Sequence, residues 1–360
     1  YFMLNHDQLR KKLSYKKNNL NKLSKIDHHI FIEALKIREI QKHIVSVYRS
    51  DLKMKCPIHL SFGQELPSVI LNKKIGLKDF VFCHHRSHSH FLSKTSEIKK
   101  FYAELMGKFS GANRGFAGSQ DISLNKKNFH AGAILGGSIG IAVGSAFSNK
   151  LKKEKKISVA VFGEGAAQQG LFWESINYAS LNKLPIIFFC ENNKYATYSD
   201  YKENFLNKSL SKIVSEFKLK TLVASTYDLN DLKKKIFQSV KLARKNIPVF
   251  LEILTYRYNA HVGTDDNDYI ANYRNKEEIS FWKKHDLLDI YKKKYNPNLN
   301  IFRKKIDKIY QQLKKEKEKK ISNWNNFNYS NENNNIFNQI KIRVSKIKTK
   351  SARITLPDPY

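Results

Sequence analysis

Short apolar runs alternate with helical patterns through the middle of the chain. Four apolar runs predict strands, at Ile157–Phe162, Ile186–Cys190, Leu219–Ala224 and Val249–Leu254. Helical spacing of apolar residues fills the segments 166–183 and 230–245 between them. Because apolar strands that alternate with helices are typical of a mostly parallel sheet with helices on both faces, the pattern predicts an α/β fold. Right-handed crossovers would place the carboxyl ends of the strands at one edge, where such folds bind ligands.

The two ends of the chain differ from this middle. Residues 1–27 are rich in Lys and Asn and predict a basic arm, either mobile or a weak amphipathic helix. Apolar spacing predicts a core-facing helix over 28–49 and amphipathic helices over 275–295 and 301–320. Nine of the sixteen residues in 323–338 are Asn, a low-complexity composition. We therefore predict three parts, an arm at 1–27, a domain at 28–295, and a C-terminal helix with an Asn/Lys-rich tail at 296–360.

The formal net charge of +33 first suggests a nucleic-acid partner. Eleven of the 65 basic residues are Arg, however, and the other 54 are Lys spread along the chain. Arg is the preferred side chain for phosphates and base edges, so this composition argues against nucleic-acid binding. Asn, Ile, Phe and Tyr are also abundant, as expected when nucleotide bias acts on the sequence. We predict no nucleic-acid partner.

Composition also indicates the cellular compartment of the protein. The 360 residues are 41% hydrophobic and 12% aromatic, enough for a packed core. Three Cys residues, far apart in sequence, argue against a disulfide scaffold and for a reducing compartment. No uninterrupted apolar stretch reaches the roughly 18 residues of a membrane span. These observations predict a cytoplasmic protein with no membrane partner.

The segment from Ile157 to Ser199 carries the strongest chemical signal. Gly163 and Gly165 flank Glu164 directly after a predicted strand, in a turn that we expect to be too tight for side chains. A helix predicted to begin at about Ala166 would present free N–H groups to a phosphate. A lone carboxylate would be unfavourable beside a diphosphate unless a cation lay between them.

Asn192 and Asn193 follow the next predicted strand, so they should lie at the same edge of the sheet. A carboxylate, an amide oxygen and a backbone carbonyl form part of the oxygen shell that Mg²⁺ prefers. The alternative is an ordinary strand–turn–helix, but an Asn pair beginning 28 positions after Glu164 is a much rarer combination. The spacing therefore predicts Mg²⁺ bridging a diphosphate.

This segment resembles the thiamine-diphosphate signature of the α subunit of 2-oxo acid dehydrogenase E1 components, the family of pyruvate, branched-chain and acetoin dehydrogenases. Five further motifs resemble the family in the same order, HLSFGQEL at 59–66, HHRSH at 84–88, GFAGSQD at 115–121, TYRYNAH at 255–261 and YR at 273–274. The resemblance runs from about His59 to Arg274 and implies the thiamine-diphosphate-binding fold.

The resemblance also implies cofactor ligands. Glu164, Asn193 and the carbonyl of Tyr195 would hold Mg²⁺. The diphosphate would lie against Gly163, with backbone donors from Gly165 and Ala166. Further contacts are implied with Arg86 at the diphosphate, the backbone near Leu135 at the aminopyrimidine, and His261.

The catalytic candidates implied by the resemblance are His59, His88 and His261. His88 and His261 would line the mouth of the site, near the substrate carboxylate and the lipoyl arm. The implied reaction is oxidative decarboxylation of a small 2-oxo acid with acyl transfer to a lipoyl group on an E2 partner. A separate E1 β subunit would complete the site, because this chain is too short to contain both halves. The alternative is an acetoin dehydrogenase, or a transketolase-like or decarboxylase subunit without lipoyl transfer.

Several positions depart from the family pattern. Glu164 stands where Asp is usual, and His85 stands where a Tyr precedes the arginine. GSQD replaces a segment that ends in His. These departures concern mainly the substrate side of the expected site. Two other readings stay open: a zinc site within Cys83–His90, and helix packing within or between subunits at Gly136, Gly140 and Gly144.

Overall fold

The computed structural model describes residues 5–15, 20, 22–48, 50–51, 53–54, 56–206, 209–265 and 273–316. The chain divides into two units, residues 1–317 and 318–360, and residues 318–360 lie outside the described residues together with the predicted Asn-rich segment. The division into arm, domain and tail stays a prediction.

The elements follow one another from α1 to α13, with two 3₁₀ turns (η). In chain order they are α1 His6–Tyr15, α2 Lys25–Tyr48, α3 Glu65–Lys74, β1 Phe80–Cys83, α4 His88–Thr95, α5 Ile98–Leu105, η1 Asn125–Lys127, β2 Phe129–Ala131, α6 Gly137–Leu151, β3 Ser158–Gly163, η2 Glu164–Gln168, α7 Gly170–Leu181, β4 Ile186–Asn192, β5 Tyr195–Ala196, β6 Ser199–Asp200, α8 Tyr201–Asn204, α9 Leu210–Ser215, β7 Lys220–Ser225, α10 Leu229–Ala243, β8 Val249–Leu254, α11 Lys276–Lys284, α12 Leu287–Tyr295 and α13 Asn300–Lys315.

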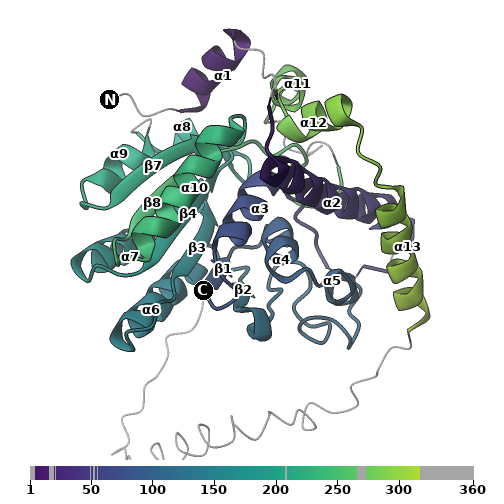
Figure 1. The fold of residues 1–360 in the computed structure, drawn as a ribbon, viewed down its shortest axis with the longest axis horizontal. Coiled ribbons are helices and arrows are strands. Elements are labelled where there is room, and N and C mark those ends of the chain that lie inside the picture. The colour runs from purple at the N-terminus through teal and green to yellow at the C-terminus, as the bar shows by residue number, and fades with distance from the viewer. Residues whose placement is uncertain are drawn as a thin grey trace, which may run out of the picture. The chain divides into compact units, whose positions relative to one another are not determined.

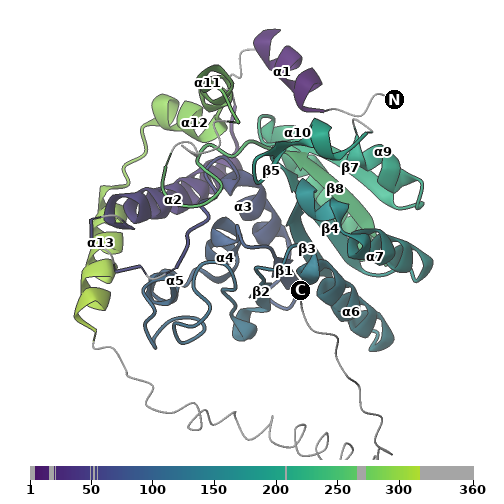
Figure 2. The ribbon, with the colours of Figure 1, turned by 180° about the vertical axis from the view of Figure 1, so that it is seen from behind.

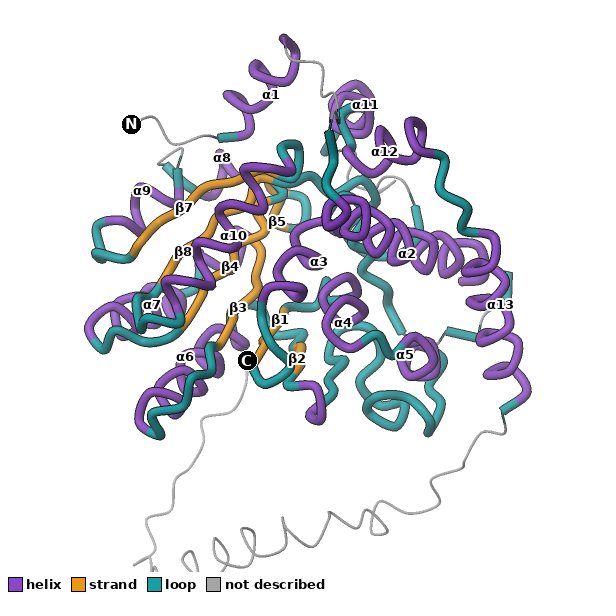
Figure 3. The backbone as a smooth tube through the Cα atoms, in the orientation of Figure 1, coloured by secondary structure: helices purple, strands orange, loops and turns teal. Residues whose placement is uncertain are grey.

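A parallel sheet of six strands forms the centre of the fold, in the order β2-β1-β3-β4-β8-β7 (Figure 3). This confirms the predicted α/β class. Strands β3, β4, β7 and β8 correspond to the four predicted strands, with ends that shift by two residues at most. Strands β1 and β2 extend the sheet beyond the prediction.

Alternate residues of each central strand enter two separate apolar cores. In β3, Val159 and Val161 belong to the core that also contains residues of α2, α3 and α10, whereas Ala160 and Phe162 belong to the core that contains residues of α6, α7 and α9. Figures 1 and 2 show α10 and α3 on one face of the sheet and α6 and α7 on the other. Because both faces are covered, every residue of β4 and β8 is buried.

Two predicted helices are interrupted. The helix predicted over 166–183 is instead η2 followed by α7, because Gln169 has an extended backbone between them. The helix predicted over 275–295 divides into α11 and α12 at His285 and Asp286. Asp286 accepts hydrogen bonds from the N–H groups of Leu288 (2.7 Å) and Asp289 (3.2 Å), so it caps α12.

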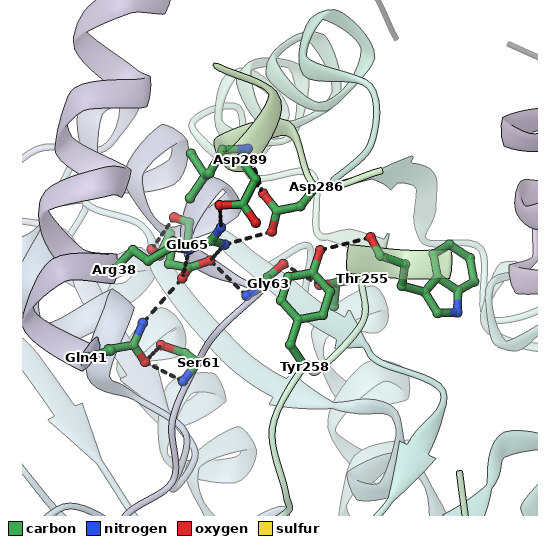
Figure 4. A network of polar contacts seen from close by, with 12 residues as sticks. Arg38, Gln41, Ser61, Gly63, Glu65, Thr255, Tyr258, Asp286 and Asp289 are labelled. Carbon is green, nitrogen blue, oxygen red and sulfur yellow. Dashed lines mark hydrogen bonds and ion pairs between the residues drawn. The ribbon is translucent and has the colours of Figure 1, made fainter. Parts of the chain in front are cut away.

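The same Asp286 belongs to a buried ion-pair network around Arg38 of α2 (Figure 4). The Arg38 guanidinium donates to both oxygens of Glu65, at 2.9 and 2.8 Å, and to Asp286 at 2.9 Å. Burial raises the pKa of Glu65 while the Arg38 charge lowers it, so each charge depends on its partner. The network joins α2, α3 and α12, three elements far apart in sequence.

Both flanking helices of the described chain bury apolar side chains. In α1, Leu9 and Leu13 are buried, so the amphipathic-helix alternative applies to residues 6–15. In α13, Ile306, Tyr310 and Leu313 are buried against the apolar core that contains α2 and α5. None of the described helices is long and apolar enough to cross a membrane.

The N-terminal helix α1 is anchored by a buried histidine, and this predicts a pH dependence. His6 Nε2 donates to the Thr255 carbonyl at 2.9 Å, and burial lowers the pKa of His6 to about 4. When α1 detaches, His6 returns to an ordinary pKa near 6.5. The detached state then binds more protons between these values, so docking is strongest above pH 6.5 and weakens as the pH falls.

We expect the docking equilibrium of α1 to fall about tenfold between pH 7.5 and 5.5. Amide exchange of residues 6–15, corrected for the intrinsic pH dependence, measures this. His6→Gln keeps a donor for the Thr255 carbonyl and should remove the pH dependence. Equal protection of the wild-type helix at both pH values would contradict the prediction.

Candidate functional site

A cavity lies at the edge where the carboxyl ends of the parallel strands meet. The segments that follow β1, β3, β4 and β8 all contribute to it, as expected for a parallel sheet. It is lined by His84, His85, Arg86, Leu135, Gly163, Glu164, Gly165, Ala166, Asn193, Tyr195, Ala196, Thr197 and His261. All but two of the predicted site residues, His59 and His88, belong to this lining.

Glu164 is a buried carboxylate whose hydrogen bonding is incomplete. Its Oε2 accepts from the Asn193 N–H at 3.1 Å, whereas its Oε1 is buried and has no hydrogen-bond partner among the described residues. Burial raises the pKa of Glu164 to about 7. A cation at Oε1 would hold this carboxylate ionised, which fits a metal-binding role.

Asn193 and Tyr195, in the segment after β4, line the same cavity as Glu164. Asn193 Oδ1 accepts from the Tyr195 N–H at 3.1 Å, and Tyr195 begins the short β5–β6 hairpin. Lys194, between them, has a positive φ of 78°, which is uncommon for a residue other than Gly. Its Nζ is held by Glu278 at 2.7 Å and Asp200 at 3.1 Å. These ion pairs hold the loop in a strained backbone conformation.

The two glycines beside Glu164 have different roles. A Cβ added to Gly165 would lie 2.7 Å from the Cβ of Ala196, so the β5 hairpin packs too closely for a side chain there. A Cβ on Gly163 would meet nothing closer than the Glu191 carbonyl at 4.0 Å. The expectation of a turn too tight for side chains is therefore right for Gly165 and wrong for Gly163.

Arg86 places a buried positive charge on the lining of the same cavity. Its Nη1 donates to the Leu60 carbonyl at 2.7 Å and its Nη2 to the His261 carbonyl at 2.9 Å. Burial, followed by the nearby charge of Arg257, lowers the pKa of Arg86 well below its usual range. An anion in the cavity would offset both effects, so Arg86 fits a diphosphate-binding role.

Three histidines from separate segments meet beside Arg86. The ring of His59 lies 4.7 Å from that of His85 and 5.3 Å from that of His261, and its buried Nδ1 has no described hydrogen-bond partner. Burial and the Arg86 charge lower the pKa of His59 to about 2 and that of His261 to about 3, so both rings are neutral at pH 7. Neutral rings can each donate one N–H to a bound substrate oxygen.

These three rings are close enough to share a metal ion, the one such group of His, Cys, Asp or Glu among the described residues. Burial, Arg86, Arg257 and His84 all lower the pKa of His261, however, so this corner favours an anion over a cation. The zinc alternative for Cys83–His90 is not supported, because among the described residues the one group close enough to share an ion takes only His85 from this segment. His90 contacts Glu191, and His88 contacts Ser119.

His88 does not lie at the mouth of the cavity as expected. It is fully buried at the start of α4, 2.6 Å from the Ser119 hydroxyl, and its ring packs against Phe101. The expected position was wrong because the first turn of α4 directs this side chain toward Ser119 of the 115–121 segment. A catalytic role for His88 stays a prediction without direct contact with the cavity.

Leu135 and the glycines of α6 take different positions. Leu135 lines the cavity and is 43% exposed. Gly140 packs against Leu171 of α7, where an added Cβ would lie 3.3 Å from the leucine, so close contact within the chain accounts for it. An added Cβ on Gly144 would meet no described atom within 4 Å, and this position carries no packing role within the described chain.

Sequence reasoning missed two buried charged residues next to the cavity. Arg257 Nη2 donates to the Thr197 carbonyl at 3.2 Å and thus ties the segment after β8 to the β5–β6 hairpin. Glu191, at the end of β4, accepts from His90 at 3.1 Å. The signal for Glu191 was present, since an acid inside an apolar strand that is buried on both faces requires partners.

Comparison with known families assigns this arrangement. The family described as dehydrogenase E1 component matches residues 33–333, which include the whole cavity lining. The chain belongs to the dehydrogenase E1 component family.

Three relatives are pyruvate dehydrogenase E1 component alpha subunits. The chain is 33% identical over 225 residues to the pyruvate dehydrogenase E1 component subunit alpha of Rhizobium meliloti (strain 1021), covering 61% of this chain and 63% of that protein. It is 32% identical over 251 residues to the mitochondrial protein of the same name from Solanum tuberosum (69% and 63%). It is 33% identical over 234 residues to the protein of the same name from Rickettsia typhi, covering 64% of this chain and 70% of that protein. The chain thus spans somewhat less than two thirds of the first two relatives.

The two glycines that flank Glu164 allow a matched pair of variants. Gly165→Ala should displace the β5 hairpin, and we expect it to destabilise the chain by about 1–3 kcal/mol, as overpacking does. Gly163→Ala meets no close atom and should change the free energy of unfolding by less than about 0.5 kcal/mol. Urea unfolding without cofactor measures both. Equal unfolding midpoints for the two variants would contradict the assigned packing.

Proposed function

We propose that this chain is the α subunit of a thiamine-diphosphate-dependent 2-oxo acid dehydrogenase. It would act in the oxidative decarboxylation of a small 2-oxo acid with acyl transfer to a lipoyl group. One observation carries the proposal: an unpaired, buried carboxylate oxygen of Glu164 and the buried charge of Arg86 belong to one cavity at the carboxyl edge of the sheet. A metal–diphosphate group has the complementary charges for both.

The side chains of the cavity can be assigned to parts of this group. Glu164, Asn193 and the carbonyl of Tyr195 would hold Mg²⁺, with Arg86 and the N–H groups of Gly165 and Ala166 next to the diphosphate and Gly163 leaving room beside it. The backbone at Leu135 would adjoin the aminopyrimidine. When bound, thiamine diphosphate supplies the carbanion that attacks the 2-oxo carbonyl and takes up the electrons as CO₂ leaves.

The histidine corner would orient the substrate. Because His59 and His261 are neutral at pH 7, each can donate a hydrogen bond to the substrate carboxylate without a second positive charge. The adjacent Arg86 supplies the positive charge that attracts this anion. His85, where the family has Tyr, adds a third imidazole and would influence which 2-oxo acid fits.

Family membership and the names of the relatives support two partners. An E1 β subunit would complete the cavity, and a lipoyl-bearing E2 would receive the acyl group. A cytoplasmic location stays a prediction. The positions that depart from the family pattern lie mainly on the substrate side of the expected site. They keep the acetoin dehydrogenase or decarboxylase alternative open.

The charge of Glu164 is the first quantity to test. Glu164→Gln keeps the size of the side chain but removes its charge, so Mg²⁺-dependent binding of thiamine diphosphate should weaken at least about 100-fold. Calorimetric titration of the full chain purified with its β partner, at saturating Mg²⁺, measures this affinity. Glu174→Gln, an exposed glutamate on α7, is the matched control. Unchanged affinity of the Glu164 variant would refute the metal assignment.

The need for a β partner is the second test. The chain alone should not decarboxylate 2-oxo acids, whereas the co-expressed pair should decarboxylate them and acylate a lipoyl domain. Full activity of the lone chain would refute the subunit assignment. Decarboxylation by the pair without lipoyl acylation would favour the alternative enzyme class.

A further inference from the structure

Glu191 is a buried acid that connects three segments around the cavity without lining it. It is 1% exposed at the end of β4. Its Oε1 lies 3.1 Å from His90 Nε2 on α4. Its Oε2 lies 3.4 Å from Gln64 Nε2, just before α3, and 3.7 Å from His84 Nε2, just after β1.

All three of these partners belong to segments that hold Arg86. His84 and His90 flank Arg86 in sequence, and the Arg86 N–H donates to His84 Nδ1 at 3.4 Å. Gln64 lies four residues after Leu60, whose carbonyl accepts from the Arg86 guanidinium at 2.7 Å. The Glu191 carboxylate is therefore connected to the backbone on both sides of Arg86 and to the segment that supplies its carbonyl acceptor.

The backbone of Glu191 belongs to the opposite side of the cavity. Glu191 pairs in register with Gly163 of β3, the residue before Glu164. It is followed directly by Asn192, which donates to Glu252 of β8 at 2.7 Å, and then by Asn193. Glu191 thus joins strands β3 and β4, which precede Glu164 and Asn193, to the segment that contains Arg86.

We propose that Glu191 is a positioning residue that fixes the Arg86 guanidinium relative to the Glu164–Asn193 pair. The two oppositely charged sides of the cavity are then held at the separation that a metal–diphosphate group requires. This inference rests on the proposed function, because it concerns the binding of that group. A buried carboxylate with several hydrogen-bonding partners is well suited to this role, since losing any partner is strongly unfavourable.

A double-mutant cycle between Glu191 and Arg86 separates positioning from general stability. The variants are Glu191→Gln, Arg86→Ala and the double variant, each as the full chain purified with its β partner. Titration with thiamine diphosphate at saturating Mg²⁺ gives the dissociation constants. We expect Glu191→Gln to weaken binding about tenfold in the wild-type background and less than twofold in the Arg86→Ala background. At saturating cofactor, the kcat of Glu191→Gln should return to within twofold of wild type.

Glu252→Gln is the matched control, because Glu252 is a neighbouring buried acid that accepts from Asn192 and Ser211 and forms no hydrogen bond with the histidines among the described residues. Its effect on the dissociation constant, whatever its size, should add to that of Arg86→Ala. If Glu191→Gln does not fold, judged by circular dichroism, His90→Gln breaks the same connection from the other side and should show the same coupling to Arg86.

Three outcomes would overturn the inference. An additive effect of Glu191→Gln in the Arg86→Ala background would mean that Glu191 acts only on the fold. An unchanged affinity of folded Glu191→Gln would mean that Arg86 does not need it. An unchanged affinity of Arg86→Ala itself would refute the diphosphate role of Arg86, a failure of the proposed function that the single variant reveals by itself.

Discussion

The parallel register of β1, β3, β4 and β8 is the constraint on which the rest of this molecule depends. Gly163 of β3 pairs with Glu191 of β4, and Asn192 pairs with Leu254 of β8. The residues that follow these pairs are Glu164, Asn193 and the 255–261 segment, so the register alone brings them to one edge. A shift of one residue would send every buried side chain of a strand to the opposite core. Both cores therefore specify the geometry of the cavity as well as the stability of the fold.

Two buried charges of opposite sign lie at this edge, Glu164 and Arg86, and they suit the proposed metal–diphosphate ligand. Burial opposes the ionised form of Glu164 and, with Arg257 nearby, the ionised form of Arg86. In contrast, Arg38 and Glu65 are equally buried but satisfy each other directly. The comparison shows how the two kinds of buried charge differ. Arg38 and Glu65 neutralise each other and stabilise the packing of helices, whereas Glu164 and Arg86 form no direct ion pair with an opposite charge among the described residues, which is consistent with the proposed metal–diphosphate ligand.

Local patterns predicted the elements whose signals lie within a few residues. The apolar runs of β3, β4, β7 and β8 and the Gly-Glu-Gly and Asn-Asn pairs could all be recognised from sequence. Strands β1 and β2 were missed because they span only four and three residues and adjoin histidines and a turn. The burial of Asp286 between α11 and α12 depends on its ion pair with Arg38, 248 residues away, and the inward position of His88 depends on Ser119. No local pattern contains such partners.

The basic residues that contribute to the high net charge differ in their positions in the fold. Four of the eleven arginines, Arg38, Arg86, Arg257 and Arg274, are at most 3% exposed, and each donates to fixed carboxylate or carbonyl oxygens. Lysine is about five times as abundant as arginine, yet the only buried lysines among the described residues are Lys94 and Lys108. A guanidinium keeps its charge when buried and donates in several fixed directions, whereas an ammonium group is more strongly hydrated. A composition shifted toward lysine on the surface therefore retains arginine where buried geometry requires it, and the position of a basic residue is more informative here than the total charge.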